Sequence, residues 1–108
     1  MSADGGGPLG AFEEQVVLAV LHARDAAWGM NVRREIEGRT GRDVTIGAVY
    51  ATLDRLEAKG LTASARARVD GVSRRIFRVT VAGRRALVET RDLRERLWRG
   101  TEGLLAEG

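Results

Sequence analysis

The stretch TIGAVYATLDRLEAKGL, residues 45–61, decides the fold. Thr45 can cap the start of a helix and Gly60 can end one, so the sequence predicts a helix over residues 46–59. One face of this helix is apolar at i, i+4 and i+7 spacing and consists of Val49, Leu53 and Leu56. The opposite face carries small or polar side chains and consists of Gly47, Ala48, Ala51, Thr52 and Arg55. Such a helix can pack on a core and still present a slim surface to a groove.

Two helices are predicted upstream of this stretch. Apolar residues recur with helical spacing from about Leu9 to Arg24, and a second helical pattern runs from about Met30 to Thr40. Residues 25–29 form the turn between them, and Gly41 is placed to end the second helix. Three helices with short connections are therefore expected over the first half of the chain.

Downstream, the pattern changes from helical to alternating. Residues 62–69 alternate between polar and apolar side chains, which predicts a half-buried strand. Asp70-Gly71 is a strong turn signal, expected within a loop that extends through Ser73, and a second strand is predicted over residues 74–80. Thr80 then caps a last helix expected from Val81 to about Leu105. The fold class is mainly α with a two-stranded β-hairpin.

The composition excludes several classes of protein. A chain of 108 residues has the length of one domain. Cysteine is absent, which excludes a disulfide scaffold, thiolate zinc sites and thiol catalysis, and His22 is the only histidine. The sequence has no Gly-rich phosphate loop and no convincing pair of carboxylates. We therefore expect no enzymatic activity, no metal and no cofactor.

The sequence also predicts where the protein is found. Its longest apolar run, from Val16 to Leu21, is too short to span a bilayer. The first ten residues carry no positive charge, unlike a signal peptide. Residues 1–8 include three consecutive glycines and are expected to be a disordered leader. We expect a cytoplasmic protein without a membrane partner.

The charge is concentrated in one segment. The whole chain has a net charge of +3, but residues 61–85 contain seven arginines and one acidic residue, Asp70. The rest of the chain is therefore net negative. A mildly acidic body with one basic segment is typical of a protein that binds a polyanion.

The order of elements is that of a winged helix-turn-helix domain, here residues 9–80, followed by a helical segment over residues 81–108. In this architecture the third helix enters the major groove of DNA and the hairpin forms a wing. We expect Thr52 to read a base edge directly, and Tyr50 to pack in the core, to reach a phosphate, or to do both. The full set of predicted DNA contacts is Thr45, Gly47, Tyr50, Thr52, Arg55, Arg66, Arg68, Arg74 and Arg75.

Residues 47–61 resemble the recognition-helix signature of PadR-like transcriptional regulators, Gly/Ser-x-aliphatic-Tyr-x-x-Leu-x-Arg-Leu-Glu-x-x-Gly-Leu. Three more segments are similar to motifs of that family: WGMNV at 28–32, RRIFRVT at 74–80 and VAGR at 81–84. The resemblance covers about residues 16–97. It departs at Met30 and Ile76, where the family has aromatic residues, which weakens any inference of an aromatic effector pocket.

The resemblance implies a homodimeric, double-stranded DNA-binding repressor that a small effector releases, in a short subclass with one helix after the wing. A two-fold dimer predicts an inverted-repeat operator. Residues at coiled-coil spacing on the last helix, together with two on the first helix, are the expected dimer contacts: Phe12, Val16, Ala86, Thr90, Leu93, Leu97, Gly100 and Leu104. Trp98 either lines a pocket for a flat aromatic effector or only packs in the interface.

An alternative function is a protein–protein interaction module that uses the same scaffold without binding DNA. Competition by duplex DNA that depends on salt would separate the two functions, because phosphate contacts release counterions.

Overall fold

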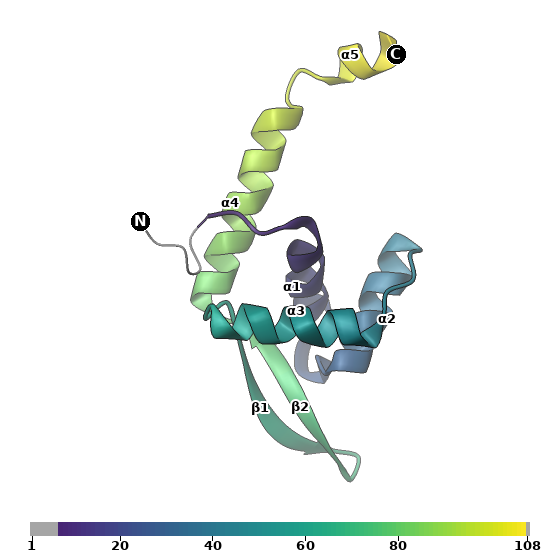
Figure 1. Cartoon of the computed structure of the whole chain (residues 1–108), viewed down its shortest axis with the longest axis vertical. Coiled ribbons are helices and arrows are strands. Elements are labelled where there is room, and N and C mark those ends of the chain that lie inside the picture. Colours follow the sequence, from purple (N-terminus) through teal and green to yellow (C-terminus); the bar gives the residue numbers. More distant parts are fainter. Residues whose placement is uncertain (1–6, 108) are drawn as a thin grey trace.

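The structure is a computed structural model that describes residues 7–107, so most of the predicted leader lies outside the described residues. Three helices are followed by a two-stranded antiparallel hairpin and a long helix (Figure 1). The elements are α1 (Ala11–Ala23), the 3-10 turn η1 (Arg24–Ala26), α2 (Gly29–Thr40), α3 (Ile46–Ala58), β1 (Thr62–Val69), β2 (Val72–Val79), α4 (Val81–Trp98) and α5 (Glu102–Glu107). The predicted fold class and order of elements are confirmed.

One hydrophobic core lies where α1, α2 and α3 meet the base of the hairpin and the first turns of α4. Val16 and Val17 of α1 and Leu53 of α3 are fully buried in it. The other buried apolar side chains come from α1, α2, α3, β2, α4 and the connections between elements, and include Val20, Val32, Ile36, Val49, Leu56, Leu61, Phe77, Val79, Ala86 and Leu87. Because α3 buries one face here, its other face is left on the surface.

Both predicted threonine caps form. The Thr45 hydroxyl accepts a hydrogen bond from the Ala48 amide at 3.1 Å, and the Thr80 hydroxyl accepts one from the Gly83 amide at 3.0 Å. Gly41 ends α2 in the left-handed conformation, with φ of 71°. These caps satisfy backbone groups that helix ends leave unpaired, and they fix where α3 and α4 begin.

The hairpin turn is tighter than predicted. Thr62 pairs with Val79 at the base and Val69 with Val72 at the tip, so Asp70 and Gly71 alone form the turn. Both have positive φ, 52° and 79°, as a two-residue turn of the type that follows the twist of the strands requires. The expected loop through Ser73 is therefore wrong, because the strands pair up to the turn.

The base of the hairpin is tied to the body by backbone hydrogen bonds. The Phe77 amide donates to the Ala27 carbonyl at 2.9 Å, and the Thr80 amide donates to the Leu61 carbonyl at 3.1 Å. Beyond this base the hairpin projects from the helices (Figure 1).

The expectation of one helix from Val81 to about Leu105 is wrong. Helix α4 ends at Trp98, and the short helix α5 begins at Glu102. Gly100 adopts φ of 84° between them, a left-handed conformation that interrupts helical hydrogen bonding. The Thr101 amide and hydroxyl then both donate to the Trp98 carbonyl, at 3.1 and 2.5 Å. The second half of α4 and all of α5 extend away from the body (Figure 1).

Within residues 7–107, no helix is both long enough and apolar enough to cross a membrane.

Candidate nucleic-acid interface

The outer face of α3 is slim and accessible. Gly47, Ala48 and Ala51 are all exposed, and no atom lies within 4 Å of the position that a Cβ on Gly47 would occupy. Thr45 at the start of the helix is also exposed. A helix with so little bulk on one face can approach the floor of a groove closely, as its sequence predicted.

Thr52 does not belong to this face, which corrects its predicted role. Its side chain is 3% exposed, and its hydroxyl accepts a hydrogen bond from Arg55 Nη2 at 3.3 Å. The sequence placed Thr52 on the outer face, but its side chain points into the core. The buried face of α3 is wider than the stripe of Val49, Leu53 and Leu56 indicates. Thr52 in this orientation cannot reach a base edge.

Arg55 is half exposed and lies at the border of the slim face. Its Nε is 3.7 Å from Glu13 Oε2 of α1, while Lys59 Nζ lies 2.9 Å from the same oxygen. Glu13 Oε1 also accepts a hydrogen bond from the Gly10 amide at 3.0 Å. Burial disfavours the charged carboxylate, but the Gly10 amide, Lys59 and Arg55 together outweigh it and lower the pKa of Glu13. Arg55 therefore links α3 to α1 as well as facing solvent.

Tyr50 lies on the surface and not in the core. Its side chain is 39% exposed, and its ring rests on the backbone of Gly29, where an added Cβ would overlap it. Of the two roles that the sequence left open, packing in the core is therefore excluded. The Tyr50 ring instead packs at the beginning of α2, near the edge of the α3 face.

The hairpin arginines differ from one another in their surroundings. Arg66, Arg68 and Arg78 are exposed and form no ion pair with a described residue. Arg68 Nη2 donates to the Gly71 carbonyl at 2.6 Å, next to the turn. Arg74 places its guanidinium over the Trp28 ring, 4.2 Å from the centroid, and its Nε is buried without a described partner. Stacking on an aromatic face restricts Arg74 without neutralising it.

Arg75 forms ion pairs with α3, which the sequence did not predict. Its Nη1 lies 3.0 Å from Asp54 Oδ1 and its Nη2 3.3 Å from Glu57 Oε1. Burial disfavours its charge, yet the contacts with Asp54 and Glu57 outweigh this and raise the pKa of Arg75. The sequence held a signal for this contact, since Asp54 and Glu57 are one helical turn apart.

Three of the predicted dimer contacts lie inside the chain's own fold, which corrects their assignment. Val16, Ala86 and Thr90 are 0%, 4% and 7% exposed, and the Thr90 hydroxyl accepts a hydrogen bond from the Leu9 amide at 2.8 Å. The first turns of α4 pack against α1 of the same chain and cover these side chains. Phe12 and Leu93 are half-buried, Leu97 and Leu104 are exposed, and Gly100 lies in the break before α5.

Other apolar residues remain exposed along α1 and α4. Leu18, Leu21 and Val88 line a groove of about 380 Å³ between the two helices, and each is at least 36% exposed. Leu18 and Leu21 both belong to the longest apolar run of the sequence, Val16 to Leu21. Trp98 is 55% exposed at the end of α4.

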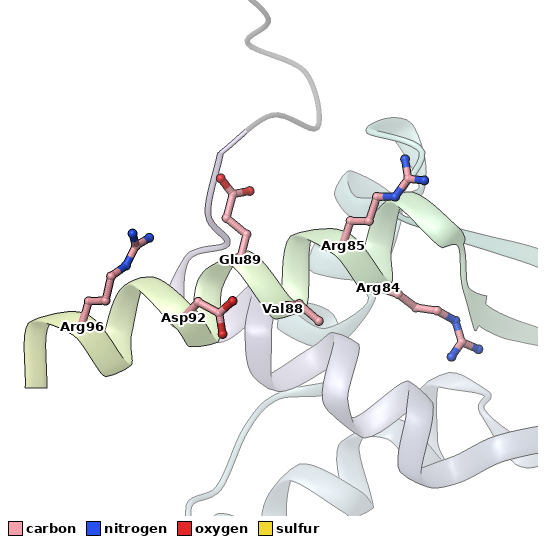
Figure 2. Close-up of a pocket in the computed structure, with 6 residues that line it drawn as sticks. All are labelled: Arg84, Arg85, Val88, Glu89, Asp92 and Arg96. Atoms are coloured by element: carbon pink, nitrogen blue, oxygen red, sulfur yellow. The ribbon is translucent and has the colours of Figure 1, made fainter. Parts of the chain in front are cut away.

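The outer face of α4 carries an ordered charge pattern around Val88 (Figure 2). Arg84 and Arg85 lie toward one end and Arg96 toward the other, with Glu89 and Asp92 between them. Together they line a shallow hollow of about 510 Å³. In residues 7–107, no group of three histidine, cysteine or acidic side chains could hold a metal ion.

A helix-turn-helix whose third helix exposes a slim face, followed by an arginine-rich hairpin, defines the winged helix-turn-helix class. Residues 17–89 match the model of the transcriptional regulator PadR-like family, and the chain belongs to this family. It is thus a transcriptional regulator, which implies DNA binding, and not an enzyme.

Individual relatives agree with this assignment. The chain is 43% identical to the transcriptional regulator Rv3488 of Mycobacterium tuberculosis over 90 residues, which are 82% of this chain and 83% of that protein. It is similar in structure to a PadR family regulator from Eggerthella lenta, with a TM-score of 0.67, 28% identity and coverage of 83% and 80% of the two chains. A PadR family regulator from Clostridium difficile has the same fold at 19% identity, with a TM-score of 0.66 over 90% and 97% of the chains.

Proposed function

We propose that this protein is a sequence-specific repressor that binds double-stranded DNA as a homodimer and is released by a small effector. The observation that carries the proposal is the pairing of the slim, exposed face of α3 with exposed hairpin arginines that have no carboxylate partner among the described residues. A helix of this shape fits the major groove, and unpaired cations beside it fit the phosphate backbone.

In the proposed complex, Gly47, Ala48 and Ala51 face the bases. The exposed start of α3 at Thr45 supports a backbone contact, since the free amides of a helix N-terminus favour phosphate. Arg55 and the Tyr50 hydroxyl lie at the edge of the face, and Arg66, Arg68 and Arg74 of the hairpin contact phosphates or the minor groove. With so few side chains on the bases, the deformability of the DNA contributes to specificity.

The proposed dimer joins the α1 and α4 surfaces of two copies. Leu18, Leu21 and Val88 provide an apolar centre. Positive charge at Arg84 and Arg85, followed by negative charge at Glu89 and Asp92, is self-complementary when two copies of α4 run antiparallel. A two-fold axis near Val88 would bring the arginines of one copy to the carboxylates of the other. This shifts the proposed interface away from the seam that the sequence favoured.

The proposed effector is a flat aromatic compound that binds near Trp98. Trp98 lines a hollow of about 310 Å³ with Leu97, Thr101 and Leu105, an apolar setting at the break before α5. Saturable quenching of tryptophan emission by planar aromatic compounds tests this site. If a Trp98→Leu protein binds these compounds as well as wild type, Trp98 only packs in the structure and does not line the binding site. In this variant the emission comes from Trp28, which is stacked under Arg74.

Selection of bound duplexes from a random pool is the experiment that tests DNA recognition. We expect an inverted repeat whose half-site centres lie about one helical turn, or a multiple of it, apart, with an affinity that falls steeply as salt rises. Failure to enrich any duplex, or binding that salt does not weaken, would contradict the proposal and favour a protein–protein interaction module.

A further inference from the structure

Arg75 is held by acceptors on two elements of the fold. In addition to Asp54 and Glu57 of α3, its Nε donates to Ser64 Oγ of β1 at 3.0 Å, and Ser64 in turn donates to Glu57 Oε1 at 2.7 Å. The guanidinium also lies over the Phe77 ring, 4.5 Å from the centroid. All three of its nitrogens are thus engaged within the chain, and bonds of this charge-assisted kind are the stronger ones in proteins.

The ion pairs of Arg75 are placed where they can set the angle of the hairpin. Thr62, Phe77 and Val79 bury the base of the hairpin, whereas residues 65–68 of β1 are exposed. An isolated two-stranded hairpin is at best marginally stable in water, so contacts with the body must set its angle. Arg75 is paired across the strands with Arg66, and it is the hairpin residue beyond the buried base that forms ion pairs with α3.

Arg75 and Arg66 therefore have different roles. Like charges directly opposite each other on a hairpin repel, and here Arg75 turns to the carboxylates of α3 while Arg66 remains exposed. A DNA phosphate would have to compete for the charge of Arg75 with the Asp54 and Glu57 carboxylates that already pair with it.

We infer that Arg75 is a positioning residue, which fixes the wing at a set angle to α3 through Asp54 and Glu57 and does not itself contact phosphate. The inference rests on the proposed DNA binding and assigns a specificity role within it. With the angle fixed, Arg66 and Arg68 reach the backbone in register with the bases that α3 reads.

Neutralising both carboxylates separates positioning from simple charge. The double variant Asp54→Asn with Glu57→Gln removes two negative charges beside the DNA surface and frees an arginine, so electrostatics alone predicts tighter binding to every duplex. If Arg75 instead fixes the angle between the hairpin and α3, the variant should bind the selected operator more weakly than wild type. A matched control, Asp25→Asn with Asp43→Asn, makes the same change in charge at two exposed carboxylates that form no ion pair with a described residue.

Two binding measurements decide between these outcomes. We expect the ratio of operator affinity to random-duplex affinity to fall about tenfold in the Asp54/Glu57 variant, comparable to one mismatched base pair. The slope of log K against log salt should fall by about two as Arg66 and Arg68 lose their contacts. The control should bind both duplexes at least as tightly as wild type, with an unchanged ratio. A parallel rise in the Asp54/Glu57 variant would overturn the inference.

Arg75→Lys provides a second variant that keeps the charge but loses the planar fork. A simple phosphate contact tolerates this change, whereas simultaneous bonding to Asp54, Glu57 and Ser64 does not. We expect Arg75→Lys to lower the ratio of operator affinity to random-duplex affinity, and Arg66→Lys to leave this ratio near that of wild type. An equal change of the ratio in both variants would count against the assignment.

Amide hydrogen exchange of the free protein tests the positioning without DNA. Strand amides of residues 63–76 should exchange faster in the Asp54/Glu57 variant and at the wild-type rate in the control. If no duplex binds wild type, the proposed function fails while this measurement still decides whether Arg75 fixes the hairpin; unchanged exchange would overturn that role.

Discussion

Gly83 in the first turn of α4 lies directly against the backbone carbonyl of Leu61. A Cβ on Gly83 would overlap this oxygen and crowd Val79 Cγ1 at 2.8 Å. Because the Leu61 carbonyl also accepts the Thr80 amide, neither partner can move freely. The contact places α4 on the base of the hairpin at a spacing that only glycine allows.

Gly83→Ala should therefore destabilise the fold by about 1–3 kcal/mol, the range for overpacking. Chemical denaturation with circular dichroism measures the change. Gly38→Ala is the matched control, because Gly38 lies in the last turn of α2 with open space around it, and alanine there should stabilise the helix by up to about 1 kcal/mol. Equal stability of the two variants would show that the Leu61 contact is not tight.

Arg66→Ala with Arg68→Ala should weaken binding to every duplex. Both side chains are exposed near the tip of the hairpin, where they fit phosphates, so the salt slope should fall by about two. Arg96→Ala with Arg99→Ala removes the same charge at the C-terminal end of α4. In titrations at several salt concentrations, this control should keep a slope of log K against log salt near that of wild type. An equal loss of slope in both variants would show that Arg66 and Arg68 do not contact phosphates directly.

Leu18→Asp with Val88→Asp should produce a monomer by light scattering and abolish tight binding to an inverted repeat. The charges enter the apolar groove between α1 and α4, where a partner would have to bury them at a high cost. Leu104→Asp with Leu105→Asp in α5 is the comparison. If the α5 variant dissociates and the groove variant does not, the interface lies along the C-terminal seam instead.

Acid should act on the fold through Glu13. Its pKa is lowered below the ordinary value of 4.5, so the carboxylate stabilises the folded state above the unfolded pKa, and this contribution is lost as the pH falls through the folded pKa. Glu13→Gln should therefore be less stable than wild type at neutral pH, with the difference shrinking as the pH falls below 4.5. Urea unfolding at several pH values tests this, with the exposed Glu102→Gln as control; a constant difference would exclude the titration of Glu13 as its cause.

Local signals in the sequence predicted most of the fold. Thr45 and Thr80 begin helices as expected, and Asp70-Gly71 makes the turn, because caps and turns depend on a few neighbouring residues. The spacing of Val49, Leu53 and Leu56 likewise placed the buried face of α3. The break between α4 and α5 was not predicted, because Gly100 also fits the coiled-coil spacing of one uninterrupted helix.

The candidate site was harder to predict because it depends on tertiary contacts. Arg74 and Arg75 are adjacent in a basic strand, yet one stacks on Trp28 and the other pairs with α3, since neighbouring residues of a strand face opposite sides. Thr52 was placed outward because the width of the buried face of α3 is set by α1 and the hairpin. Ala86 and Thr90 fit a coiled-coil spacing, but α1 of the same chain covers them.

The contacts between α1 and α4 also bear on the order of folding. The Leu9 amide meets the Thr90 hydroxyl, and Arg94 Nη1 meets Glu14 Oε2 at 2.6 Å, so both contacts join residues some 80 positions apart. Closing so long a loop in an unfolded chain carries a large entropic cost. The intervening helices and hairpin shorten that loop once they have formed, and we expect α4 to dock last. During synthesis on the ribosome, α1 would then stay uncovered after residues 9–80 have folded, until α4 emerges from the exit tunnel.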